Sequence, residues 1–117
     1  TGAIEGTTTI SDGKGALRKI IHKQESSAYT LVAADAGKAI EIASGGITVP
    51  ASVFGAGDAV TIINDSSSAQ TITKGSGLNM FNSADATNSN RTLAGRGMAT
   101  IYFVNSSTSY ISGAGLS

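Results

Sequence analysis

The sequence predicts an all-β domain, specifically a β-sandwich of jelly-roll type, and three observations support this fold class. Short runs of Val, Ile and Thr recur along the chain, and these β-branched residues suit a pleated strand. Clusters of Gly, Ser, Asn and Asp separate the runs at intervals of about ten residues, as in sandwiches and barrels. Apolar and polar residues alternate within the runs, so one face of each strand can be buried.

The length of 117 residues indicates one domain, because two independent cores would be hard to form from so short a chain. We expect an extended N-terminal arm over residues 1–15 and a single β-sandwich domain over residues 16–117. Leu17, Ile20 and Ile21 have a spacing that also fits a helix, but the β character of the remaining chain favours a strand there.

The first clear strand begins at Tyr29, and a turn at residues 35–38 follows it. Further strands are expected at residues 39–43, 47–49, 59–64, 70–73, 92–94, 98–104 and 109–111. Turns or loops are expected at residues 45–46, 54–58, 65–69 and 105–108. A long segment rich in Gly, Asn and Ser covers residues 74–90, and a Gly-rich tail ends the chain. No repeat of fixed period is evident.

The composition excludes several classes of function. Eight basic and eight acidic residues cancel, whereas general nucleic-acid binding requires a basic excess. No apolar run approaches the ~20 residues of a membrane-spanning helix, and the polar N-terminal residues do not form a signal peptide. The chain has no Cys for disulfides, which fits a reducing cytosol, and its core relies on Ala, Val and Ile. So thin a core indicates support by oligomerisation.

Groups suited to catalysis are scarce. His22 is the only imidazole, Cys is absent, and the paired G-x-G sequences lack the other residues of a phosphate loop. Most of the acidic residues after residue 30 occur in turn contexts, where Asp favours local backbone hydrogen bonds. We therefore expect no enzyme activity, no cofactor and no metal.

Half of the basic residues lie in one short stretch. Lys14, Arg18, Lys19 and Lys23 fall within ten residues, with His22 among them. Two interpretations remain open: a solvated face of a strand or helix, and a contact patch for an acidic protein surface.

One stretch of the chain resembles a known family. The segments that carry the resemblance are Tyr-Thr-Leu at 29–31, Ala-Asp-Ala-Gly-Lys at 34–38, Ile-Glu-Ile at 40–42, Ile-Thr-Val-Pro at 47–50, the Gly-rich 74–77 and the closing hairpin of 98–112. They resemble the small β-domains of tailed-bacteriophage virion proteins, found at tail-fibre tips and in head decoration proteins. That family often has a Trp in its last strand, where this chain has Tyr110, and the residues before Tyr29 match no part of the pattern. The resemblance implies a virion structural protein, commonly trimeric and without catalytic activity.

The expected function is therefore that of a bacteriophage capsid decoration (cement) protein, which stabilises the head as a homotrimer. The expected partners are copies of the chain itself and the major capsid protein or another virion protein, without nucleic acid or membrane. If Thr1 follows a removed initiator Met, the chain is nearly a whole gene product, which suits a decoration protein in a virion assembled in the host cytoplasm. The candidate capsid contacts are Lys14, Arg18, Lys19, His22 and Lys23. The alternative is a tail-fibre tip that recognises a host glycan or protein through the loop of 74–90.

Overall fold

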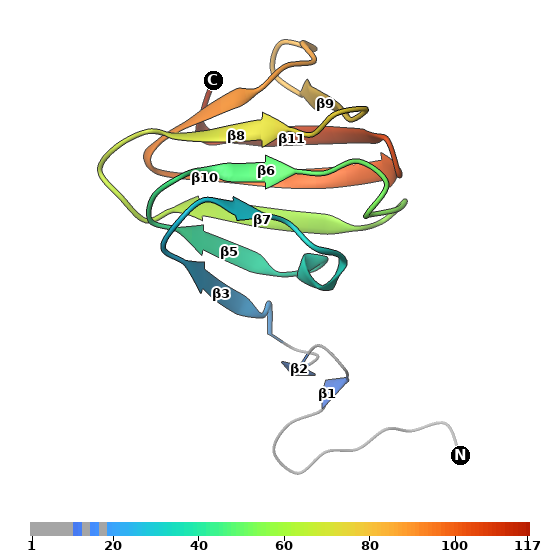
Figure 1. Cartoon of the computed structure of the whole chain (residues 1–117), viewed down its shortest axis with the longest axis horizontal. Coiled ribbons are helices and arrows are strands. Elements are labelled where there is room, and N and C mark those ends of the chain that lie inside the picture. Colours follow the sequence, from blue (N-terminus) through green and yellow to red (C-terminus); the bar gives the residue numbers. More distant parts are fainter. Residues whose placement is uncertain (1–10, 13–14, 17–18) are drawn as a thin grey trace.

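The computed structural model describes residues 11–12, 15–16 and 19–117 and confirms the all-β class. The main sheet is nearly closed, like a barrel (Figure 1). In the described part of the chain, the one helical turn is a 3-10 turn, η1 (Ala33–Asp35). No helix in these residues is both long enough and apolar enough to cross a membrane.

Three successive coils of two strands each build most of the sheet. The first coil contains β3 (His22–Glu25) and β4 (Tyr29–Thr30), the second β5 (Ala39–Ile42) and β6 (Ile47–Val49), and the third β7 (Ala59–Asn64) and β8 (Gln70–Lys74). Strands β3, β5 and β7 pair in parallel, and so do β4, β6 and β8. Each coil therefore stacks on the next, and strands that follow each other in the sequence do not pair within a coil.

The third coil is covered by one long strand, β10 (Arg91–Asn105). Its first residues pair with β8 and its residues 98–102 pair with β7, both antiparallel. The strand bends between these two parts, where Arg96 has a φ of 63°. Strand β11 (Thr108–Leu116) returns along β10 as a hairpin, and β9 (Asn79–Asn82) adds to β11 in parallel.

The core lies inside this sheet and is mainly aliphatic. Strands β5 and β7 alternate between buried and half-buried residues, as period-two geometry requires. Phe54 and Phe103 stack inside with ring centroids 4.7 Å apart. Fully burying one such side chain contributes about 1.5–3 kcal/mol to folding. The largest fully buried side chains are Phe103, Leu31, Ile40, Ile42, Ile47, Ile62, Ile72, Leu78, Met80, Leu93, Ile101 and Ile111.

Several expected elements are confirmed and others extend further than expected. The strand of residues 59–64 is confirmed with the same bounds, and the ambiguous segment of 16–24 contains the start of β3. The expected strands of 92–94 and 98–104 are parts of the single strand β10, and β11 continues through the Gly-rich tail. The expected arm of 1–15 lies largely outside the described residues. Within it, β1 (Ser11–Asp12) pairs with β2 (Gly15–Ala16).

Candidate functional site: an open coil end and an aromatic sheet face

The two ends of the coil stack differ. Strand β10 covers the third coil by pairing with both β7 and β8, whereas β3 pairs with β5 alone and β4 with β6 alone among the described residues. The main-chain groups on the outer edges of β3 and β4 therefore have no strand partner in this part of the chain. We call this end, formed by residues 22–25 and 29–30, the open coil end; it lies beside the point where the N-terminal segment enters (Figure 1).

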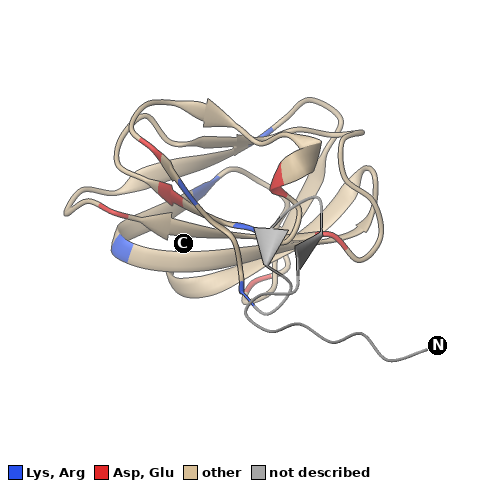
Figure 2. Cartoon of the chain, turned by 90° about the horizontal axis from the view of Figure 1, so that it is seen from below, with Lys and Arg blue, Asp and Glu red and all other residues tan. Residues whose placement is uncertain are grey.

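The predicted capsid-contact residues lie near the open coil end, and the structure does not gather them on one face. Lys14 and Arg18 lie outside the described residues. Lys19 is exposed, and His22 and Lys23 are neighbours in β3, so their side chains point to opposite sides of the sheet. Seen from this end, acidic and basic residues are interspersed (Figure 2).

His22 contacts an acidic pair on the outer side of the sheet. Its Nε2 lies 2.6 Å from Glu41 Oε1, and Gln24 donates to the same oxygen at 3.3 Å. The neighbouring carboxyl of Asp65 shares a hydrogen bond with Glu41, which raises the pKa of Asp65 and lowers that of Glu41. Arg96 also donates to Asp65, at 2.7 Å. The two carboxyl groups thus lie next to each other, with His22 on the side of Glu41 and Arg96 on the side of Asp65.

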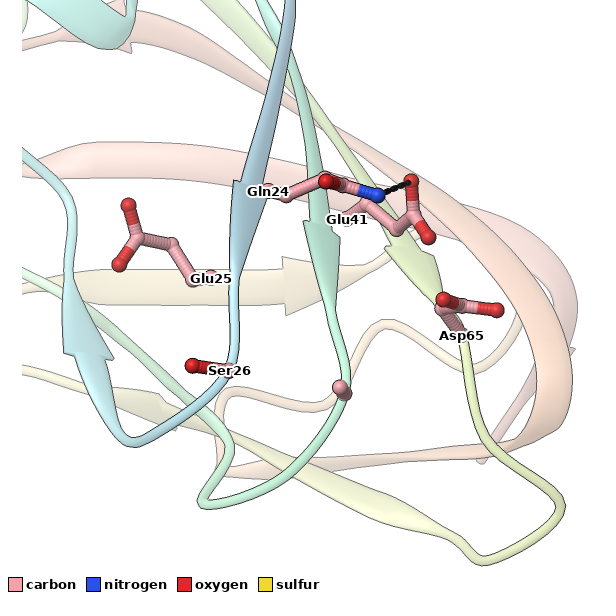
Figure 3. A pocket seen from close by; sticks show the side chains of 6 residues that line it. Gln24, Glu25, Ser26, Glu41 and Asp65 are labelled. Carbon is pink, nitrogen blue, oxygen red and sulfur yellow. Dashed lines mark hydrogen bonds between the residues drawn. The ribbon is translucent and has the colours of Figure 1, made fainter.

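These acidic residues line a shallow hollow of about 380 Å³ (Figure 3). In the close-up, Gln24, Glu41 and Asp65 lie together, whereas Glu25 points to the other side of β3. Among the residues that the structure describes, no group of three or more His, Asp or Glu side chains is arranged to hold a metal ion. The cluster joins neighbouring coils through side-chain contacts.

Lys23 belongs to a separate, partly buried chain of hydrogen bonds. Its Nζ donates to Tyr29 Oη at 2.6 Å, and that hydroxyl donates to Asp35 Oδ2 at 2.7 Å. The ammonium group also lies 4.5 Å from the centre of the Tyr29 ring, which adds a cation–π contact. The hydrogen bond with Tyr29 raises the pKa of Lys23, and burial raises the pKa of Tyr29.

Partly exposed aromatic and aliphatic side chains form a patch on the outer surface of β10, β11 and β9. Tyr102 and Tyr110 are direct partners in the antiparallel pair and are 48% and 45% exposed. Phe81 of β9 is the register partner of Tyr110, with ring centroids 5.6 Å apart. Met98 and Val104 extend the patch along β10 and are also exposed. We call these five residues the aromatic sheet face.

The segment of 74–90, which is the recognition loop in the alternative interpretation as a tail-fibre tip, is held by many hydrogen bonds. It contains β9, and Phe81 bridges to Asn88. The buried guanidinium of Arg91 donates to Thr87 Oγ1 at 2.8 Å, contacts Asp85 at 3.4 Å and also donates to Ser89. The Thr87 hydroxyl lowers the pKa of Asp85 by donating to its carboxylate. The segment is thus tied to the domain by hydrogen bonds, with Leu78, Met80 and Asn82 buried and residues 83–88 exposed.

The aromatic sheet face is the feature that the sequence reasoning missed. In residues 98–104, one face of the strand carries Met98, Thr100, Tyr102 and Val104, and the other carries Ala99, Ile101 and Phe103. Both sets are mainly apolar, so the sequence does not show which face is exposed to solvent. The usable signal was the presence of Ile101 and Phe103 in one set, because these residues are the more often buried.

A scan against protein-family models and a search of curated proteins find nothing that matches this chain.

Proposed function

We propose that this chain is a bacteriophage capsid decoration (cement) protein, a structural component that stabilises the head as a homotrimer. The proposal includes a β-sandwich, with the stacks β3-β5-β7 and β4-β6-β8 as its two sheets, and an arm over residues 1–15; the parallel pairing within these stacks differs from the antiparallel jelly roll that the sequence predicts. The observation that carries the proposal is the open coil end. One end of the stack of coils is covered by β10, so in the part of the chain that the structure describes only the other end of the stack offers free strand edges to a capsid protein.

The open coil end suits attachment because an exposed strand edge accepts another strand. Ala39 N donates to Ile21 O and Ala43 N donates to Glu25 O, so residues 21, 23 and 25 face β5. By the same alternation, the backbone groups of His22 and Gln24 face outward. Tyr29 N donates to Gly46 O, just before β6, and Leu31 N donates to Thr48 O of β6, which leaves the backbone of Thr30 facing outward from β4. Main-chain hydrogen bonds to such an edge are a common way of binding an extended segment.

Assembly into a trimer would strengthen this attachment. Once one subunit of a trimer has bound the shell, the other two subunits are held close to their own binding sites. All three contacts must then break together, so a trimer detaches far more slowly than a monomer. Exposed Lys19 lies at the same end and adds an electrostatic contact with an acidic shell surface. The role needs rigid geometry and no bond-making chemistry.

The experiment is co-sedimentation of the full chain with expanded phage heads, together with the solution mass from light scattering. Gln24→Pro removes an outward N–H and keeps the main-chain bonds to β5, and Thr30→Pro likewise removes an outward N–H and keeps the main-chain bonds of β4; the side-chain bond from Gln24 to Glu41 is lost equally in Gln24→Ala. We expect the two proline variants to lose head binding and the matched alanine variants, Gln24→Ala and Thr30→Ala, to retain it. Equal binding by all four variants would refute attachment through the open coil end, and a monomer on the head would refute the trimer.

A tail-fibre or receptor-binding tip is the second candidate, and the observation that favours it is the solvent exposure of Tyr102 and Tyr110. Exposed aromatic residues on a rigid sheet are more typical of ligand recognition than of a purely mechanical role. Copy number distinguishes the two: a decoration protein approaches the number of capsid subunits, whereas a fibre protein is present in far fewer copies.

A further inference from the structure

We propose that the aromatic sheet face, formed by Phe81, Met98, Tyr102, Val104 and Tyr110, binds an uncharged saccharide. This inference goes beyond the assembly role and does not depend on whether the protein sits on a head or a tail. It also concerns a different surface from the open coil end, so the two proposals can fail separately.

The rings form a row across three adjacent strands. Tyr102 lies directly opposite Tyr110, and the Phe81 ring tilts by 33° against that of Tyr110. Because neighbouring strands are about 4.8 Å apart, the row runs across the sheet at right angles to the strands. The rings thus present one extended apolar strip to solvent.

The strands that carry the rings are anchored to the core. Ile101 and Phe103 flank Tyr102 in β10, and both are fully buried; Ile111 beside Tyr110 and Met80 beside Phe81 are also fully buried. Each ring-bearing strand is therefore anchored by the core on its other face. A ligand that stacks on the rings does not have to order the backbone beneath them first, which reduces the entropic cost of binding.

The charge of the surrounding surface selects the class of ligand. Residues 59–64, 79–82 and 97–117 contain no Lys, Arg, Asp or Glu. Single-stranded nucleic acid also stacks on aromatic residues, but it requires basic residues along its phosphates, so the neutral surface argues against it. The same reasoning disfavours anionic lipids and acidic glycans. An uncharged ligand with an apolar face matches the surface.

Polar groups beside the rings suit the hydroxyls of a sugar. Thr100 lies two residues from Tyr102 on the same side of β10, and its Oγ1 is 3.0 Å from Thr61 Oγ1 of β7. Ser112 is the cross-strand partner of Thr100, and exposed Asn79 lies two residues before Phe81. A pyranose ring has C–H groups on its faces and hydroxyls at its edge. Such a ring can stack on the aromatic strip while its edge reaches these hydroxyl and amide groups.

The size of the patch favours a small ligand over a protein. The aromatic sheet face spans three strands and about six residues along β10, which corresponds to roughly 300 Å². A specific protein–protein interface needs about 800 Å² from each partner, which is more than twice this area. A short oligosaccharide fits within the patch. Because the surface is flat and buries only one side of a ligand, we expect a dissociation constant on the order of 1 mM for a single copy, with tighter binding in a multivalent virion.

The experiment is an NMR titration of the isotope-labelled full chain with three uncharged probes, chitotriose, cellotetraose and maltotetraose, and with sialyllactose as the anionic control. We expect at least one neutral probe to shift the amide signals of residues 98–112 and 79–82, and sialyllactose to leave them unchanged. The chain has no Trp, so its tyrosine fluorescence gives a second, independent signal.

Variants test the role of the rings. We expect Tyr102→Ala or Tyr110→Ala to weaken binding by about tenfold or more, and Tyr102→Phe to stay within about twofold of the original. Val53→Ala, at an exposed apolar residue outside the aromatic sheet face, is the matched control and should bind normally. The proposal is overturned if no neutral probe shifts these signals at about 10 mM, or if the alanine variants bind equally well. It is also overturned if the signals change on dilution alone, which would assign the face to a second copy of the chain.

Discussion

The Tyr29 hydroxyl donates a hydrogen bond of 2.7 Å to Asp35 Oδ2, and this contact fixes the turn that connects the first coil to the second. The same oxygen accepts the Val32 N–H at 2.9 Å. Asp35 is fully buried, and its other oxygen, Oδ1, has no hydrogen-bond partner and lies 3.6 Å from Lys23 Nζ. A buried carboxylate is stable only when such partners surround it, so the three side chains act as a unit.

Removal of the buried carboxylate should therefore destabilise the domain. We expect Asp35→Ala to lower the free energy of unfolding by about 2–4 kcal/mol, because the Tyr29 hydroxyl loses its acceptor and the Lys23 ammonium loses its ion-pair partner. Tyr29→Phe removes one hydroxyl and should cost about 1–3 kcal/mol. Urea denaturation measures both values. A double variant that costs as much as the sum of the single variants would show that the residues do not act as a unit.

The same contacts predict a loss of stability at alkaline pH. Folding raises the pKa of Lys23 above its ordinary value of 10.5 and that of Tyr29 above 10.0. The folded state thus holds these protons more strongly than the unfolded state, so the contribution is complete below about pH 10 and is lost as the pH rises further. Urea midpoints from about pH 8 to about pH 11 measure the decline. The combined variant Lys23→Met, Tyr29→Phe should show a shallower decline; an equal slope would contradict this assignment.

Alanine substitutions at three glycines distinguish the cost of steric crowding from the cost of backbone strain. A Cβ at Gly113 would lie 2.0 Å from Met98 O, so Gly113→Ala should cost more than about 3 kcal/mol or prevent folding. Gly57 has a φ of +91° and open space around it, and Gly57→Ala should cost about 1–2 kcal/mol from strain alone. Gly55 has neither constraint, so Gly55→Ala should stay within about 0.5 kcal/mol of the original protein. Thermal denaturation compares the three, and a different order would contradict these backbone assignments.

The strands were predictable from the sequence because alternation and β-branched residues act locally, as residues 59–64 demonstrate. Their pairing was not. Gly45-Gly46 resembles a simple turn, yet a Cβ at Gly46 would lie 2.5 Å from Thr71 O, so this glycine permits close stacking on the next coil. Similarly, Gly95 and Gly97 suggest a break between two strands, whereas the sheet continues through them as a bend. Parallel stacking depends on contacts between residues about 20 positions apart in the sequence, and short runs do not encode their partners.

The candidate site shows the same limit. His22 and Lys23 were grouped because they are neighbours in the sequence, but a strand places them on opposite sides of the sheet, with Glu41 near one and Asp35 near the other. The alternation of residues 98–104 was visible, but its solvent side depends on the hairpin with β11. Charge counts and periodicity show which residues share a face of a strand. The pairing of that strand with its neighbours decides which face is exposed to a partner.

Arg91 should determine whether residues 83–90 remain ordered. Its side chain is 7% exposed, and it holds Asp85 and Thr87 against the end of β10. Arg91→Met keeps the length of the side chain and removes the guanidinium donors, so we expect faster amide exchange in residues 83–90 and a loss of about 1–3 kcal/mol. Arg96→Met is the matched control, because Arg96 pairs with Asp65 on the surface and should contribute less than about 0.5 kcal/mol. Hydrogen-exchange mass spectrometry measures the local change. If both variants exchange alike, the buried guanidinium does not order this segment, and its order must come from the pairing of β9 with β11.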